Sequence, residues 1–269
     1  METISYRSGT IRFHDVGIGP PLVLVHGSFA NANSWRQISD LMSDRFRILA
    51  PDLAGYGGTS APKPVEPIRV DRHVEVVDAI MDYAGEPIHL VGHSAGGAFA
   101  LATALRHSSK IFSLTLVEPL PMHVLKLTGK DATYDAVRDM YDAYVADFEG
   151  GNQYAAKHVI DFWGGKGSFD SFPDKFKEFA AETTPLNIMD WQTYWGDEQT
   201  AEAYRAFKVP TLVIKGELGA PAAGDHCSGL YELLINSEYR EIPGASHFAV
   251  ATHAKQVADL IAEHVSGLR

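Results

Sequence analysis

The chain has 269 residues, of which 45% are hydrophobic and 21% are charged. These proportions exclude an intrinsically disordered chain, and the length allows one large domain or one domain with an insertion. With 23 Lys and Arg residues against 34 Asp and Glu residues, the net charge is −11, which argues against nucleic acid or an anionic membrane surface as a partner.

A single cysteine, Cys227, excludes an internal disulfide framework and fits a reducing compartment. No apolar run approaches the roughly 20 residues that span a bilayer. Residues 1–5 lack the basic segment and the apolar segment of a signal peptide. We therefore expect a cytoplasmic globular protein, a monomer or a homodimer, that binds no membrane.

In chain order, residues 2–15 predict a hairpin at the edge of a sheet. Short apolar and β-branched runs then predict buried strands, and helical spacing of apolar residues predicts helices between them. The strands are expected at 22–25, 47–49, 88–91, 113–117, 211–214 and the more polar run 239–242, and the helices at 71–84, 95–107 and 252–266. This alternation predicts an α/β fold with a mostly parallel sheet covered on both faces.

The alternation stops between residues 121 and 205, where no buried strand is evident. This block holds 15 of the 28 aromatic residues, with 15 Asp and Glu residues against 8 Lys and Arg. Helical stretches are expected around 137–148, 152–163, 173–182 and 187–205. We predict a helical cap at 121–205, inserted between strands six and seven of a core formed by 1–120 and 206–269.

The segment Gly92-His93-Ser94-Ala95-Gly96 follows a predicted strand and opens a predicted helix. In that context the Gly-x-Ser-x-Gly pattern predicts a nucleophilic serine on a sharp turn, with small residues on either side to avoid collision. The start of the helix provides free N–H groups and positive potential near the serine. Ser94 is therefore the predicted nucleophile.

A serine nucleophile needs a base, and His247 follows directly after the last predicted strand. A turn there would return its side chain to the edge of the sheet that carries Ser94. The N–H groups of Ser28 and Ala95 are the predicted oxyanion hole. A structural role is the simpler interpretation for His26 and His93. Phe29 and His93 are also candidate substrate contacts.

The aromatic residues of the cap suggest an apolar lid over the site. Trp163, Trp191 and Trp195 are the predicted substrate contacts from this block. No cluster of His, Cys and Asp has the spacing of metal ligands, so we expect no metal and no cofactor.

Together, the Ser94 turn, the His26-Gly27 loop, the stretch Asp52–Ser60 and Gly244–His247 resemble the α/β-hydrolase superfamily. The match covers both core segments in the right order. The resemblance implies the α/β-hydrolase fold, a Ser–His–acid triad and a cap between strands six and seven. The stretch Asp52–Ser60 is interpreted as a structural turn.

The position of the triad acid departs from this resemblance. Most relatives place it after strand seven in a pattern like Gly-x-x-Asp, where this chain has Gly219. Glu118 ends strand six, beside the histidine loop, where some relatives place their acid. A carboxylate there is costly unless it is paired, so we predict Glu118 as the acid. Glu217 and Asp225, the latter on an expected loop rich in Gly, Ala and Pro, remain alternatives.

A serine nucleophile argues against dehalogenase-like and epoxide-hydrolase-like relatives, which use aspartate. We predict a serine hydrolase that cleaves an ester, thioester or lactone of a small, mainly apolar substrate through an acyl-enzyme. The alternatives are a carbon–carbon bond hydrolase or a cofactor-free perhydrolase with the same triad. The acidic cap argues against substrates with carboxylates. A non-catalytic ligand-binding protein is the remaining alternative, supported only by the missing acid at Gly219.

Overall fold

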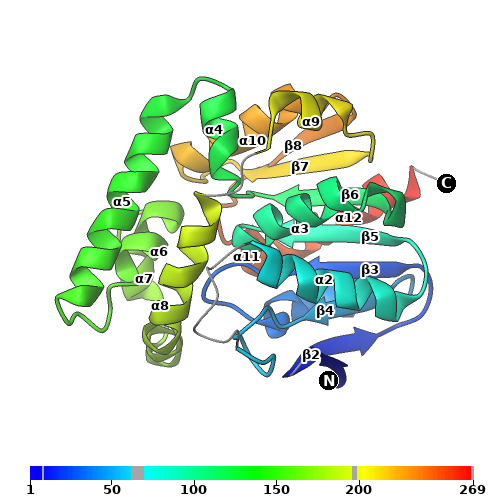
Figure 1. The fold of residues 1–269 in the computed structure, drawn as a ribbon, viewed down its shortest axis with the longest axis horizontal. Coiled ribbons are helices and arrows are strands. Elements are labelled where there is room, and N and C mark those ends of the chain that lie inside the picture. The colour runs from blue at the N-terminus through cyan, green and yellow to red at the C-terminus, as the bar shows by residue number, and fades with distance from the viewer. Residues whose placement is uncertain (8, 62–69, 196–198, 268–269) are drawn as a thin grey trace.

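The computed structural model describes residues 1–7, 9–61, 70–195 and 199–267. An eight-stranded sheet runs through it in the order β1-β2-β4-β3-β5-β6-β7-β8 (Figure 1). The strands are β1 Glu2–Tyr6, β2 Gly9–Val16, β3 Pro21–Val25, β4 Arg47–Pro51, β5 Ile88–His93, β6 Ile111–Val117, β7 Thr211–Gly216 and β8 Ser237–Ile242. β2 pairs antiparallel with β1 and β4, and the other pairs are parallel.

The predicted sheet is therefore confirmed, including the hairpin at its edge and all six predicted strand runs. All five residues of β3 are buried, because this central strand is covered on both faces. Its side chains alternate between two cores: Val23 and Val25 pack into one, and Leu22 and Leu24 into the other.

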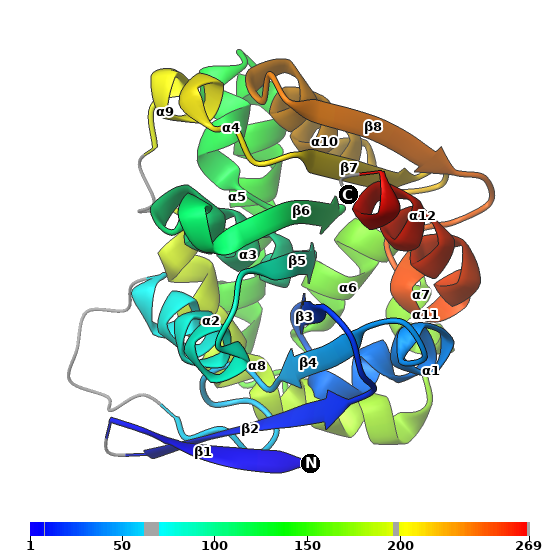
Figure 2. The ribbon, with the colours of Figure 1, turned by 90° about the vertical axis from the view of Figure 1, so that its right-hand side faces the viewer.

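Two layers of helices cover the sheet (Figure 2). One core contains residues of α2 (Asp71–Ala84), α3 (Ala95–Arg106) and α10 (Pro221–Leu233), and the other contains residues of α1 (Arg36–Met42) and α12 (Ala254–Ser266). The remaining short helices of the core segments are the 3₁₀ helices Ala32–Trp35 and Ser108–Lys110, and α11 at Ala249–Thr252. The predicted helices at 71–84, 95–107 and 252–266 are thus present.

Between β6 and β7 the described residues form helices and no strand. The helices are α4 Met122–Leu127, α5 Asp131–Glu149, α6 Lys157–Gly164, α7 Ser168–Ser171, α8 Asp174–Tyr194 and α9 Ala201–Ala206. α5 to α8 stand together beside the sheet (Figure 1). The predicted helix break between 182 and 187 is wrong, because α8 continues through Pro185. Buried side chains on both sides of that proline, among them Thr184 and Asn187, hold the helix together despite the lost backbone hydrogen bond.

The segment after Gly219 also differs from the prediction. The expected Gly-, Ala- and Pro-rich loop is the 13-residue helix α10, which begins with Pro221 in its first turn. Proline is favourable there and alanine is the best helix former, so the local sequence favours a helix. A Cβ atom at Gly229 would lie 2.8 Å from Val124 Cγ1, so the glycine inside the helix permits close packing on α4.

Every helix in the described ranges is too short or too polar to cross a bilayer.

Candidate active site

Ser94 lies at the turn between β5 and α3, at the carboxyl end of the parallel sheet. Its backbone has φ 55° and ψ −123°, a strained conformation for a residue other than glycine. A Cβ atom at Gly92 would overlap the carbonyl of Gly96, and one at Gly96 would overlap the carbonyls of Val25 and His26. The two glycines therefore permit the turn that presents the Ser94 hydroxyl.

His247 reaches Ser94 from the loop that follows β8. Its Nε2 atom lies 2.9 Å from Ser94 Oγ, within hydrogen-bond distance, and both residues are about 5% exposed. The two residues are 153 positions apart in the chain. An imidazole at this distance can take the hydroxyl proton when the serine attacks an electrophile.

Glu118 lies directly after β6 and is fully buried. Its Oε2 atom is 2.6 Å from His247 Nδ1, and its Oε1 atom accepts a hydrogen bond of 2.8 Å from the amide of Gly216. The Glu118 backbone has φ 42°, a left-handed conformation that is unusual outside glycine. Both carboxylate oxygens thus have a partner, as the burial of a charge requires.

The surroundings keep the Glu118 carboxyl ionised. Burial raises its pKa, but the hydrogen bond and the charge of His247, together with the Gly216 amide, outweigh burial and leave the pKa below its ordinary value. An ionised carboxylate accepts the Nδ1–H of His247 and leaves Nε2 to accept a proton from Ser94.

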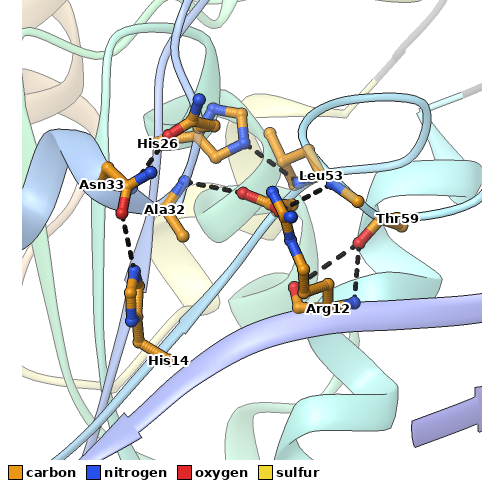
Figure 3. A network of polar contacts seen from close by, with 10 residues as sticks. Arg12, His14, His26, Ala32, Asn33, Leu53 and Thr59 are labelled. Atoms are coloured by element: carbon orange, nitrogen blue, oxygen red, sulfur yellow. Dashed lines mark hydrogen bonds and ion pairs between the residues drawn. The ribbon is translucent and has the colours of Figure 1, made fainter. Parts of the chain in front are cut away.

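Two further histidines hold the loops of the site. His93 Nε2 donates to the carbonyl of His247 at 2.8 Å. Burial and, next, the charge of His247 lower the pKa of His93 to about 3, so this ring stays neutral. His26 Nδ1 donates to the carbonyl of Gly27 at 2.8 Å, and its Nε2 accepts from the Leu53 amide at 3.0 Å (Figure 3). The expected structural role of His26 agrees with these contacts.

The Asp52–Ser60 stretch anchors the same region of the core. Asp52 is fully buried and accepts hydrogen bonds from the amide of Ala32 (2.9 Å) and from Arg12 Nε (2.8 Å). Figure 3 shows this network beside His26, with Thr59 bonded to the Arg12 backbone. The stretch therefore ties the loop after β3 to the edge strand β2, in agreement with its interpretation as a structural turn.

The amides of Ser28 and Ala95 face no competing acceptor. Ala95 is the first residue of α3, so its N–H has no partner within the helix. Neither amide has a hydrogen-bond acceptor among the described residues. Phe29, next to Ser28, has φ 51°, which marks a second sharp turn at the site.

A cavity of about 620 Å³ opens onto Ser94 and His247, a size within the usual range for small-molecule sites. Its lining contains no Lys, Arg, Asp or Glu residue among those described. Helices α6 and α8 and the segment before α8 provide aromatic walls: Trp163, Phe172, Phe176, Phe179 and Trp191. Ser28 and Phe248, which lie outside residues 121–205, also line the cavity.

Of the predicted substrate contacts, Phe29, His93, Trp163 and Trp191 line this cavity. Trp195 does not. It directly follows α8 and packs against the rings of Tyr134 and Tyr141 on α5, and also against that of Trp191.

Sequence reasoning missed Phe172, Phe176, Phe179 and Phe248. The first three have the 4- and 3-residue spacing of one helical face, but that spacing does not distinguish a cavity wall from a packed core. Phe248 directly follows His247 in the sequence, and this position is the signal that could have identified it as a cavity residue.

The two alternative acids lie elsewhere. Asp225 is on α10 and accepts a hydrogen bond from Thr133 Oγ1. Glu217 Oε2 accepts from the amide of Gly244 at 2.7 Å, so it fixes the turn before His247 without a recorded contact to the ring. Of the three candidates, only Glu118 contacts His247.

The chain is similar in sequence to known hydrolases. The chain is 26% identical over 265 residues to the 2-hydroxymuconate semialdehyde hydrolase of Pseudomonas sp. (strain CF600), covering 94% of this chain and 89% of that protein. It is 33% identical over 133 residues to the pimeloyl-[acyl-carrier protein] methyl ester esterase of Vibrio cholerae serotype O1, covering 49% of this chain and 50% of that protein.

Solved structures agree on the fold. A thermophilic esterase from Thermogutta terrifontis superposes with a TM-score of 0.79 at 19% identity, covering 100% of this chain and 99% of that one. The two sequence relatives are named as a hydrolase and an esterase, which supports hydrolase activity for this chain. The family model for the alpha/beta hydrolase fold matches residues 20–254. The chain therefore belongs to the alpha/beta hydrolase family.

Proposed function

We propose that this protein is a serine hydrolase that cleaves an ester, thioester or lactone of a small, mainly apolar substrate. The observation that carries the proposal is the hydrogen-bonded series Ser94–His247–Glu118, which opens onto an uncharged cavity. Such a series supports acyl transfer, in which a base takes the serine proton and a carboxylate orients the base.

In the proposed reaction, Ser94 Oγ attacks the carbonyl carbon while its proton passes to His247 Nε2. The carbonyl oxygen becomes negative and is stabilised by the N–H groups of Ser28 and Ala95. The carbon–oxygen or carbon–sulfur bond then breaks, and the leaving group takes the proton from His247. Water, deprotonated by His247, releases the acid and regenerates Ser94.

The lining of the cavity supports a neutral substrate. A carboxylate buried in this cavity would meet no Lys or Arg among the described lining residues, and an unpaired buried charge is costly. The second candidate, a carbon–carbon bond hydrolase, is favoured by the long match to the Pseudomonas semialdehyde hydrolase. Another relative is named for a hexa-2,4-dienoic acid substrate. The absence of a described cationic partner disfavours such acids here.

We further propose that residues 121–205 act as a cap that selects the substrate. Trp163 and Trp191 belong to this block and line the cavity, whereas Ser94, His247 and Glu118 do not belong to it. The cytoplasmic location and the monomeric or homodimeric state remain predictions from the sequence.

Two measurements test the proposal. A fluorophosphonate probe should label the wild-type protein at Ser94, and a panel of p-nitrophenyl esters of graded chain length should be turned over. A matched 2-hydroxy-6-oxo-dienoate should be a poorer substrate than the best ester. Labelling with no ester turnover but rapid dienoate cleavage would establish the second candidate instead. The absence of labelling would favour a ligand-binding protein.

A further inference from the structure

Gly219 lies beside the carboxylate of Glu118, three residues after the end of β7. Its amide donates to the carbonyl of Gly216 at 2.9 Å, which closes a tight turn before α10. A Cβ atom at position 219 would overlap Glu118 Oε1 and lie 3.0 Å from Glu118 Cδ. The carboxylate of Glu118 therefore occupies the space that a side chain at position 219 would need.

The carboxylate has no freedom to move away from such a group. Oε1 is held by the Gly216 amide at 2.8 Å and Oε2 by His247 Nδ1 at 2.6 Å. A displacement large enough to admit a methyl group at 219 would break one of these hydrogen bonds. The His247 ring would then lose the partner that fixes its orientation and tautomer.

The backbone conformations at positions 118 and 219 agree with this interpretation. Gly219 is outside the left-handed region, so its backbone accepts any L-residue and only the space excludes a side chain. Glu118, in contrast, has a left-handed φ of 42°. The residue with the side chain thus has a backbone suited to glycine, and the glycine has a backbone suited to a side chain.

We infer that Gly219 is a positioning residue: the absence of a side chain at 219 lets the Glu118 carboxylate lie against His247 Nδ1 and the Gly216 amide. This inference rests on the proposed function of Glu118. Its consequence is that any side chain at 219 displaces that carboxylate and inactivates the protein.

The first test is a double-mutant cycle. Gly219→Ala should lower ester turnover by roughly 10²-fold, within the approximately 10⁴-fold span of losing a triad acid. In the Glu118→Gln background the same change should cost less than about threefold, because Gln keeps the size of Glu but no longer serves as the acid. The downfield proton resonance of His247 Nδ1–H should shift or disappear in Gly219→Ala. The matched control is Gly267→Ala at the end of α12, where a Cβ atom meets nothing closer than 3.6 Å, and it should match wild type.

The second test uses a larger side chain. Gly219→Asp should be nearly inactive, because its Cβ atom alone would already overlap Glu118 Oε1. Urea unfolding verifies that each variant is folded.

The outcomes separate the inference from the function on which it rests. Full activity of Gly219→Ala, full activity of Gly219→Asp, or an equal loss from Gly219→Ala in the Glu118→Gln background would each overturn the inference. Unlabelled wild type, or full activity of Glu118→Gln, would instead refute the proposed function.

Discussion

The indole of Trp163 stacks on the imidazole of His247, with ring centroids 5.6 Å apart and planes inclined by 30°. Trp163 is on α6, within the helical block, whereas His247 follows β8 in the core. The block and the proposed base therefore share a wall of the cavity, and changes in one are expected to affect substrate at the other.

Removal of that wall should change which substrates are preferred. Trp163→Ala and Trp191→Ala each enlarge the cavity, so longer acyl chains should gain roughly 10- to 100-fold relative to short ones, the usual value of one bulky apolar contact. The ranking of kcat/KM over an ester panel measures this. Trp195→Ala is the control because Trp195 packs outside the cavity lining. A change of ranking in Trp195→Ala alone would contradict the assignment.

Loss of the nucleophile should separate activity from stability. Ser94→Ala should abolish labelling and lower turnover by roughly 10⁴-fold or more, since triad residues act as a unit. Ser94→Gly should be equally inactive but more stable than Ser94→Ala by about 1 kcal/mol, because glycine accepts the positive φ without strain. Urea unfolding compares the two variants. At least a tenth of wild-type esterase activity in purified Ser94→Ala would refute the assignment.

Loss of the proposed triad acid, Glu118, should also lower activity. Glu118→Gln should reduce turnover by roughly 10³–10⁴-fold while slow labelling of Ser94 remains detectable. Asp225→Asn and Glu217→Gln should stay within about tenfold of wild type, since each contacts Thr133 or Gly244 and not His247. Steady-state kinetics on one ester decides between them. Collapse of activity in Asp225→Asn with Glu118→Gln unaffected would reverse the assignment.

Low pH should destabilise the folded protein, because it protonates histidines that are buried in the neutral form. Burial lowers the pKa of five of them, and it lowers that of His93 and His226 to about 3. The five are His26, His73, His93, His226 and the partly buried His264. Below pH ~6.5 the unfolded chain binds protons that the folded chain excludes, so stability is greatest above that pH.

The free energy of unfolding should therefore fall by up to about 1.4 kcal/mol per pH unit for each such histidine between pH ~6.5 and the folded pKa. Urea unfolding at pH 7.5, 6 and 5 measures the slope. His226→Leu should reduce that slope by the share of one histidine, whatever its effect at neutral pH. A stability that rises toward pH 5 would contradict this expectation.

The sequence predicted the parts of the structure that depend on local patterns. Apolar runs such as Leu22–Val25 can only be buried strands, and the order of strand, Ser94 and helix predicts the turn at the nucleophile. The contact of Glu118 with His247 was predicted for a similar reason, since a carboxylate that ends a buried strand needs a partner.

Features that depend on tertiary packing could not be predicted from local sequence patterns. Pro185 argues locally for the end of a helix, and only the buried contacts around it keep α8 continuous. The Gly and Ala content near Asp225 suggested a loop, although Pro221 at the start of α10 was a usable helix signal. Trp191 and Trp195 both pack against Tyr141 of α5, and only the tertiary structure shows that Trp191 also lines the cavity.

The insertion of six helices between β6 and β7 also has a consequence for protein synthesis. Ser94 and Glu118 leave the ribosome before this block, and His247 leaves long after it. A nascent chain that ends within the block holds a nucleophile and a carboxylate but no base, and Glu118 lacks its amide partner at Gly216. The contacts of Ser94 with His247, and of Glu118 with His247 and Gly216, therefore form only when β7, β8 and the loop after them dock on the sheet. On the proposed function, we expect a chain that ends before β7 to be inactive.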